Sequence, residues 1–353
     1  MVYRVVQWAT GAMGRTALRA VLDHPDLELV GLYVYNPAKE GRDAGDIVRR
    51  PATGVSATRR IEDIEACAAD VVLHMPQLQM PYESHAAEIA RLLASGKDVI
   101  TITAHHHPLI DSPGVVEMLQ DACRQGNSTF FGTGVNPGFI MERLAVTATG
   151  LCTRVDRISV REVFDASAIA DLSYIKDVLG FGADPAEVDL VEGPLARLFR
   201  SQFIGSVDYV GRAMGMDFDE IVSDNSVVAA PDDIMTAAGV IARGSIAATT
   251  WRLHGTRSGQ PIATIDVNWT VAPELTGHHA DGHWHLQITG RPGVDIRVDL
   301  IDPDEPGVRT RAAQYATVAP ALHAIPVVRQ APPGLFELPP LLPFRPRMAD
   351  NRR

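Results

Sequence analysis

Three consecutive histidines, His105, His106 and His107, follow the largely β-branched stretch "DVITITA" at residues 98–104. Such a run predicts a buried strand, so the histidines would lie at its carboxyl end, where open α/β sheets bind ligands. Histidine titrates near neutral pH and can therefore exchange the proton that hydride transfer to a carbonyl or imine requires. We predict His105 as general acid/base, with His106 second. The alternative is a loop with one orienting and two solvated histidines.

Other polar residues follow neighbouring predicted strands. Asn136 lies in "GTGVNPGF" and could position a nicotinamide carboxamide or a substrate oxygen. Equally, it could cap a helix beginning near Phe139. Pro76 and Gln77 follow the strand "VVLHM", and Thr103 lies beside the histidines. We expect these three residues to border a cofactor, because the carboxyl ends of parallel strands share one edge.

The cofactor is indicated by residues 5–22, "VVQWATGAMGRTALRAVL", which predict a strand, a glycine turn and a helix. The turn fits G-x-G-x-x-G except that Ala9 replaces the first glycine. Gly11 would admit a pyrophosphate close to the backbone, and Gly14 would let the helix pack tightly on the strand. The helix N-terminus would attract the phosphates. The residues expected to hold the dinucleotide are Thr10, Gly11, Ala12, Met13, Gly14 and Arg15. The alternative is that the glycines serve packing alone.

The second predicted strand, residues 27–35, ends without the carboxylate that NAD-specific folds place on the ribose 2′-hydroxyl. Asn36 and Lys39 follow it, with Arg42 nearby, and they suit a 2′-phosphate. We therefore predict NADP, with NAD possible as a second cofactor. A solvated loop lysine is the alternative for Lys39.

These residues require a particular architecture. The first 135 residues or so alternate strand and helix patterns, which predicts a doubly wound (Rossmann) parallel sheet. From residue 151, long strands of alternating polarity predict an α+β domain on a largely antiparallel or mixed sheet. We expect a dinucleotide-binding domain at 1–150 and a substrate and dimerisation domain at 151–309. A helix and a Pro-rich strap, 310–353, would return to the first domain.

The second predicted domain holds further candidates. Tyr174, Trp251 and His254 are expected substrate-pocket residues, although most such aromatics belong to a core. A polar stretch, "TGHHADGHWH", places two histidines on one face of a strand, a spacing that a metal could use. A polar loop entering a strand is the favoured interpretation, so we predict no metal. The residues concerned are His278, His279, Asp281, His283 and His285.

Composition limits the partners. The net charge is −11 and no basic stripe occurs, which argues against nucleic acid and anionic membranes. The three cysteines are far apart and lack metal-binding spacing, which indicates a reduced, cytoplasmic protein. The chain enters its first strand at once, so we expect no signal peptide. No apolar run approaches the ~20 residues of a membrane span.

Four stretches, "VVQWATGAMGRTALRAVL", "GLYVYNPAKEGRDAGD", "GTGVNPGF" and "ALHAIPVVRQAPPG", occur in order along the chain. Together they resemble the dihydrodipicolinate reductase-like oxidoreductases, and more closely the branch of 2,4-diaminopentanoate dehydrogenase and native amine dehydrogenases. The resemblance implies a Rossmann domain, NAD(P) and a homodimer. The reductases' His-His-x-x-Lys motif is absent. Where the amine dehydrogenases carry a catalytic Glu, this sequence has Ala104 and His105.

We therefore expect an NAD(P)-dependent oxidoreductase that transfers hydride between nicotinamide and a small carbonyl, imine or amine. The resemblance favours an amine dehydrogenase-like reaction. The missing Glu, which activates ammonia in that branch, favours carbonyl or imine reduction without ammonia. Another alternative is a non-catalytic sensor that binds NADP. A metal-assisted enzyme that uses the cluster at residues 278–285 is a weaker alternative.

Overall fold

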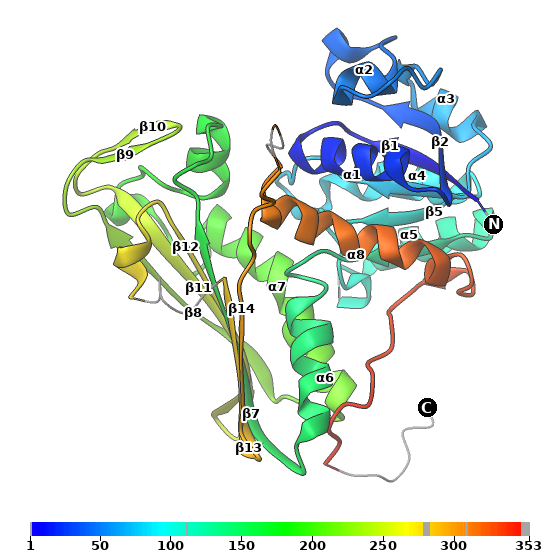
Figure 1. Cartoon of the computed structure of the whole chain (residues 1–353). Coiled ribbons are helices and arrows are strands. Elements are labelled where there is room, and N and C mark those ends of the chain that lie inside the picture. The colour runs from blue at the N-terminus through cyan, green and yellow to red at the C-terminus, as the bar shows by residue number, and fades with distance from the viewer. Residues whose placement is uncertain (1, 111, 278–282, 306, 308–309, 347–353) are drawn as a thin grey trace. The chain divides into compact units, whose positions relative to one another are not determined.

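The computed structural model describes residues 2–110, 112–277, 283–305, 307 and 310–346 (Figure 1). Contacts divide the chain into two compact units. Unit 1 comprises Met1–Phe139 and Leu300–Leu338, and unit 2 comprises Ile140–Asp299 and Pro339–Arg353. The first boundary thus falls at 139 rather than 150. The expected 310–353 segment is shared between the units instead of returning entirely to the first.

Unit 1 is built on a seven-stranded sheet in the order β15-β6-β5-β4-β1-β2-β3. Every pairing in it is parallel. The strands are β1 (Tyr3–Trp8), β2 (Leu27–Tyr33), β3 (Ala57–Thr58), β4 (Val71–His74), β5 (Asp98–Thr101), β6 (Thr129–Gly132) and β15 (Gly334–Leu335). The order in which successive strands join the sheet reverses between β1 and β4, which is the switch point of a doubly wound dinucleotide fold. The predicted Rossmann domain is confirmed.

Helices cover both faces of this sheet because successive side chains of a buried strand point to opposite sides. Val5 shares a core with α1 and α8, whereas Val6 shares another with α4 and α5. Figure 1 shows α8 and α1 running side by side. The helices are α1 (Ala12–Asp23), α2 (Ala44–Val48), α3 (Ile61–Ala66), α4 (Ala86–Ala94), α5 (Pro113–Gly126) and α8 (Ala312–Val328), with single turns η1 (Pro37–Lys39), η2 (Tyr82–His85) and η3 (Pro108–Ile110).

The strand that carries the histidines is shorter than its sequence predicts. β5 ends at Thr101, so residues 102–107 form a loop. Thr101 Oγ1 accepts a hydrogen bond from the Thr103 backbone N–H at 3.2 Å. Such local side-chain bonds offer the backbone an alternative to the strand ladder. The histidines therefore lie on a loop beyond the sheet edge.

Unit 2 contains a six-stranded mixed sheet in the order β14-β13-β7-β12-β11-β8. β7 and β12 are parallel and the other neighbours antiparallel, which confirms the predicted mixed sheet. The strands are β7 (Arg154–Asp165), β8 (Glu220–Ala229), β11 (Ile246–Arg257), β12 (Gln260–Thr270), β13 (Trp284–Arg291) and β14 (Val294–Val298), with a separate hairpin of β9 (Ile234–Thr236) and β10 (Gly239–Ile241).

A long helix, α7 (Pro194–Met214), packs on β8, β11 and β12. The segment after residue 139 belongs to unit 2 because its buried Glu142 accepts a hydrogen bond from Ser206 of α7 at 2.5 Å. The shorter helical segments are η4 (Ile140–Ala145), α6 (Val146–Ala148), η5 (Thr149–Leu151), η6 (Tyr174–Val178), η7 (Pro185–Glu187) and η8 (Pro273–Thr276). Within the described part of the chain, no helix has the length and apolarity to cross a membrane.

Backbone N–H groups of the Pro-rich tail form hydrogen bonds in both units. In unit 1, β15 pairs with β6, and the Phe336 N–H donates to the Phe130 carbonyl at 2.9 Å. In unit 2, the Phe344 N–H donates to Thr149 Oγ1 at 2.9 Å. Just before β15, Arg329 pairs with the buried Asp98 at 2.8 Å. The end of α8 is thereby anchored to the start of β5.

The glycine turn begins with backbone strain. Ala9, which stands where the motif has its first glycine, has a φ of 73°. This left-handed conformation costs an L-residue about 1–2 kcal/mol. The last glycine of the motif, Gly14, is required, since a Cβ there would lie 2.2 Å from the Ala9 carbonyl oxygen. The close approach of α1 to β1 thus depends on Gly14.

We expect Ala9→Gly to leave the free energy of unfolding unchanged within about 0.5 kcal/mol, because relief of strain offsets the lost methyl burial and the freer unfolded chain. The same substitution at Ala20, inside α1, should lower it by about 1 kcal/mol. Urea unfolding of both variants measures the difference. Equal losses at the two positions would contradict the strain at Ala9.

Arg329→Ala should lower the free energy of unfolding by about 2 kcal/mol, because it leaves the buried Asp98 carboxylate without its cation. The matched control is Arg4→Ala, which removes an exposed partner of Asp70 and should have a much smaller effect. Thermal unfolding of both variants tests the comparison. If the two substitutions lower the melting temperature equally, α8 is not anchored through Asp98.

Candidate functional site

The predicted dinucleotide residues gather at the carboxyl edge of the unit 1 sheet. Gly11 is the N-cap of α1, and a Cβ built on it meets no atom within 4 Å, so the turn is open toward that edge. Thr10 is buried, whereas Ala12 and Arg15 are exposed and Met13 is half-buried. No acidic side chain occupies the first turn of α1. The backbone donors there can therefore receive a pyrophosphate without repulsion.

Lys39 is not a solvated loop lysine. Its Nζ donates to the Thr10 carbonyl at 3.0 Å and to Thr10 Oγ1 at 2.9 Å. Asn36 supports this arrangement, because its Oδ1 accepts from the Ala38 N–H and caps the short turn η1. Burial lowers the pKa of Lys39, and the neighbouring charges of Arg15 and Arg42 lower it further. Three cations thus gather between the glycine turn and the end of β2.

All three histidines of the 105–107 loop are buried. His105 has a φ of 57°, and its N–H donates to the Tyr82 hydroxyl at 2.9 Å. The rings of His105 and Tyr82 meet edge to face, with centroids 5.4 Å apart. His107 Nδ1 lies 3.4 Å from Glu337 Oε1. The alternative of two solvated histidines is therefore wrong.

The segment with Asn136 lies against the histidine loop. A Cβ at Gly132 would lie 2.4 Å from His106 Cα, so the two backbones touch at a position only glycine permits. At Gly134, a Cβ would lie 3.8 Å from His106 Nε2. Asn136 is half-buried and precedes a cis peptide bond to Pro137. The structure thus brings His105, His106 and the 133–138 loop together at one edge.

The loop after β4 belongs to the same assembly. Thr103 Oγ1 donates to the Pro76 carbonyl at 2.9 Å, which ties the loops after β4 and β5 to each other. His85 Nε2 lies 2.9 Å from the Gln77 carbonyl oxygen. Pro76 and Thr103 are buried, whereas the Gln77 side chain is exposed. The loop after β4 is therefore held by the side chains of His85, on η2, and Thr103, in the loop after β5.

A hydrogen-bonded network, absent from the sequence predictions, underlies these loops. Its centre is Glu88, in the first turn of α4. Glu88 Oε1 lies 2.9 Å from His74 Nε2 and 2.7 Å from His85 Nδ1. The Tyr35 hydroxyl donates to the same carboxylate at 2.8 Å and accepts from Trp8 Nε1 at 2.8 Å. Ends of β1, β2 and β4 thus converge on one carboxylate.

The partners determine the charges in this network. Burial raises the pKa of Glu88, but hydrogen bonds from His74 and His85 outweigh it and set the pKa to about 2. Burial lowers the pKa of His85, but its bonds to Glu88 and to the Gln77 carbonyl raise it above the ordinary value. Burial lowers the pKa of His74. At neutral pH, Glu88 is therefore anionic and His74 neutral.

His74, His85 and Glu88 also form a group whose ligand atoms lie within 4.8 Å of one another. Ligands of one tetrahedral ion stand about 3.3 Å apart, because each lies about 2.0–2.2 Å from the metal. Here the ring nitrogens lie 2.7 and 2.9 Å from one carboxylate oxygen, which is hydrogen-bond spacing.

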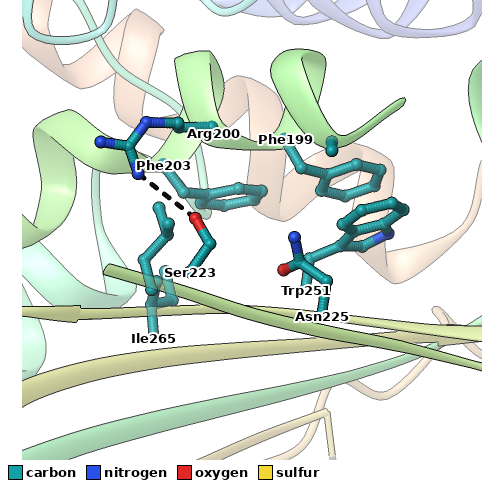
Figure 2. Close-up of a pocket in the computed structure, with 9 residues that line it drawn as sticks. Phe199, Arg200, Phe203, Ser223, Asn225, Trp251 and Ile265 are labelled. Atoms are coloured by element: carbon teal, nitrogen blue, oxygen red, sulfur yellow. Dashed lines mark hydrogen bonds between the residues drawn. The ribbon is translucent and has the colours of Figure 1, made fainter. Parts of the chain in front are cut away.

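The unit 2 candidates do not form one pocket. Trp251 points toward α7 and stacks on Phe199, with centroids 4.6 Å apart. His254 lies on the opposite face of β11, where Nδ1 is 3.0 Å from Thr264 Oγ1. Residues three apart in a strand face opposite sides, so the expected shared pocket is wrong. The cavity beside Trp251, in Figure 2, holds about 10 Å³, too little for an organic substrate.

Tyr174 lies elsewhere in unit 2, on η6. Burial, together with the charge of Glu162, raises its pKa to about 12. Glu162 itself is buried and accepts from Trp269 Nε1 at 2.7 Å and from Trp284 Nε1 at 2.8 Å. The sequence predictions did not include this carboxylate. Its signal was an acidic residue within an otherwise alternating strand.

The histidine-rich stretch is described only in part. His278, His279 and Asp281 lie outside the described residues. His283 and His285 lie two apart, on one side of the sheet. Each contacts a carboxylate near β14: His283 contacts Asp299, and His285 Nε2 lies 2.9 Å from Asp295. These carboxylates are the acidic partners of His283 and His285, the two described histidines of the stretch.

Two family models match this chain. The model of the dihydrodipicolinate reductase N-terminus matches residues 5–101, which include the glycine turn and Lys39. The model of the 2,4-diaminopentanoate dehydrogenase C-terminal domain matches residues 139–353. The boundary between the two models is consistent with the unit boundary after Phe139.

Related proteins agree with these matches. An amine dehydrogenase of Streptomyces virginiae is 28% identical over 348 residues, 94% of either chain. A 2,4-diaminopentanoate dehydrogenase of Acetoanaerobium sticklandii is 23% identical over 99% of this chain and 96% of its own. The solved amine dehydrogenase of Mycobacterium smegmatis shares the fold, with a TM-score of 0.75 at 20% identity over 95% of this chain and 94% of that one. The chain belongs to the NAD(P)-dependent oxidoreductase family that carries the 2,4-diaminopentanoate dehydrogenase C-terminal domain.

Proposed function

We propose that this oxidoreductase uses NADPH to reduce a small carbonyl or imine, with His105 as the proton donor. The observation that carries the proposal is the position of His105, buried at the same sheet edge as the open glycine turn. Unit 1 would bind the dinucleotide and unit 2 the substrate. When bound, the dinucleotide supplies the hydride.

The residues of the glycine turn fit a dinucleotide. Open space at Gly11 and the uncapped N-terminus of α1 suit a pyrophosphate, and Thr10, Ala12, Met13 and Gly14 shape the turn. Lys39, Arg15 and Arg42 provide three cations for a 2′-phosphate beyond β2, with Asn36 capping the turn. Pro76, Gln77, Thr103 and Asn136 would border the nicotinamide.

His105 would donate a proton to the substrate heteroatom as hydride reaches the carbon. Its backbone is fixed in a left-handed conformation by the Tyr82 hydroxyl, which limits the directions its ring can take. Burial excludes water that would compete for the proton. The backbone of His106 packs against Gly132, where an added Cβ would lie 2.4 Å from His106 Cα, and this contact fixes the loop on β6.

Reductive amination is the second candidate, because two relatives are named for amine substrates. Against it, no carboxylate follows β5 in residues 102–107 to activate ammonia. An imidazole can still accept a proton from an incoming amine when it is neutral. The ammonium dependence of the rate separates the two reactions.

We further propose a homodimer, as the family resemblance implies, and a reducing, cytoplasmic location. Cys67, Cys123 and Cys152 are free thiols, which is consistent with such a compartment. The proposed partners are small molecules; the acidic net charge of −11 does not favour nucleic acid or anionic membranes.

The first test follows NADPH oxidation with a panel of small ketones, aldehydes and cyclic imines, each with and without concentrated ammonium. We expect turnover that does not require ammonium. His105→Gln should lower kcat by about 100-fold, the usual contribution of a general acid. His323→Gln, on the exposed side of α8, is the control and should not change kcat. An ammonium requirement would support reductive amination, and NADPH binding without turnover of any substrate would support a sensor.

Lys39→Ala should raise KM for NADPH about tenfold, because a charge-assisted bond to the 2′-phosphate is lost, and should leave KM for NADH nearly unchanged. Arg60→Ala, which removes an exposed cation of the same unit, is the matched control. Steady-state kinetics with both cofactors measure the ratio. An equal effect on NADPH and NADH would exclude Lys39 from 2′-phosphate recognition.

A further inference from the structure

We infer that His85 is a positioning residue for the nicotinamide half of the cofactor, acting as a charged bridge between Glu88 and the Gln77 carbonyl. This inference rests on the proposed function, because it assumes that the loops after β4 and β5 border the nicotinamide. No sequence prediction included His85. The inference adds a residue that contacts neither the cofactor nor the substrate but fixes the backbone that does.

The first argument is the number of bonds that the His85 ring must donate. Its Nε2 lies 2.9 Å from the Gln77 carbonyl oxygen, which can only accept. Its Nδ1 lies 2.7 Å from Glu88 Oε1, which also accepts because Glu88 is ionised. A neutral imidazole has one N–H, so the two bonds together require the imidazolium. His85 is therefore doubly protonated, and its two N–H groups link Glu88 of α4 to the loop after β4.

The second argument is the position of His85 on η2. The same turn carries Tyr82, whose hydroxyl accepts the His105 N–H at 2.9 Å. One short turn thus holds the loop after β4 through His85 and the loop after β5 through Tyr82. When His85 loses its proton, one of its two bonds is lost and η2 is no longer fixed at both ends.

The third argument is the contrast with the residues proposed to bind the adenosine half of the cofactor. Lys39 and Thr10 bond to each other, whereas the hydrogen bonds of His85 and Glu88 go to other residues. Glu88 reaches the β5 side as well, because His74 Nδ1 lies 3.2 Å from Thr101 Oγ1. A change at His85 should therefore affect the nicotinamide half selectively.

Other groups near His85 can titrate. Glu88 stays ionised down to about pH 2, and burial keeps the pKa of His74 below its ordinary value. The pKa of Tyr35 is raised by burial and by Glu88, so it stays protonated. The titratable groups that face His85 from the elements around it are Glu88, His74, Tyr35, Tyr82 and His105. Among them His105 is the proposed proton donor, so the test must separate these two histidines.

The experiment measures dissociation constants of the full chain for NADPH and for 2′-phospho-ADP-ribose, which lacks nicotinamide, from about pH 6 to pH 9. In the wild type, the preference for NADPH over the fragment should fall as pH rises, because the raised pKa of His85 means that its bridge is complete only at lower pH. At about pH 6, His85→Gln should raise the dissociation constant for NADPH about tenfold and that for the fragment less than twofold. In His105→Gln, the preference for NADPH over the fragment should still fall as pH rises, because His85 is unchanged.

Controls keep the outcomes distinct. His323→Gln, an exposed histidine of α8, should match the wild type at every pH, and thermal unfolding reports whether His85→Gln is folded. If that variant does not fold, the wild-type and His105→Gln pH profiles decide the question. Equal weakening of both ligands by His85→Gln, or a preference independent of pH, would overturn the inference alone. A wild-type chain that binds neither ligand would overturn the proposed function and the inference together.

Discussion

The carboxyl edge of unit 1 depends on one half-buried anion, the carboxylate of Glu88. Burying a charge is unfavourable unless donors replace water, and here Tyr35, His74 and His85 supply them. Glu88 also lies in the first turn of α4, where the helix dipole favours negative charge. The ends of β1, β2 and β4 are thus linked to one carboxylate through side-chain hydrogen bonds. The loops that would contact a dinucleotide are thereby fixed before any ligand arrives.

The parallel sheet could be predicted from sequence because its signals are local. β1, β4 and β5 are short apolar runs, and the helices between them repeat their apolar residues with helical spacing. The glycine turn was recognisable because Gly14 leaves no room for a side chain and Gly11 faces open space. Exact ends were less predictable. β5 stops at Thr101, and the Thr103 N–H donates to the Thr101 side chain instead of to a neighbouring strand, a choice that composition does not encode.

The site was only partly predictable, for two physical reasons. The Glu88 network joins Tyr35, His74 and Glu88, which are far apart in sequence, so no local pattern reveals it. The spacing of Tyr82, His85 and Glu88, three residues apart on one helical face, was the only available signal. By contrast, the separation of Trp251 from His254 follows from strand geometry alone, since residues three apart in β11 point to opposite faces.

The discontinuity of unit 1 has a consequence for biosynthesis. A ribosome releases residues 1–139 first, but α8 and β15, which complete the sheet and cover the face shared with α1, come from residues 312–335. Nearly all of unit 2 is made in between as one continuous stretch. The apolar face of the first unit therefore stays exposed while the second is synthesised, and that interval is when the nascent chain most needs a chaperone.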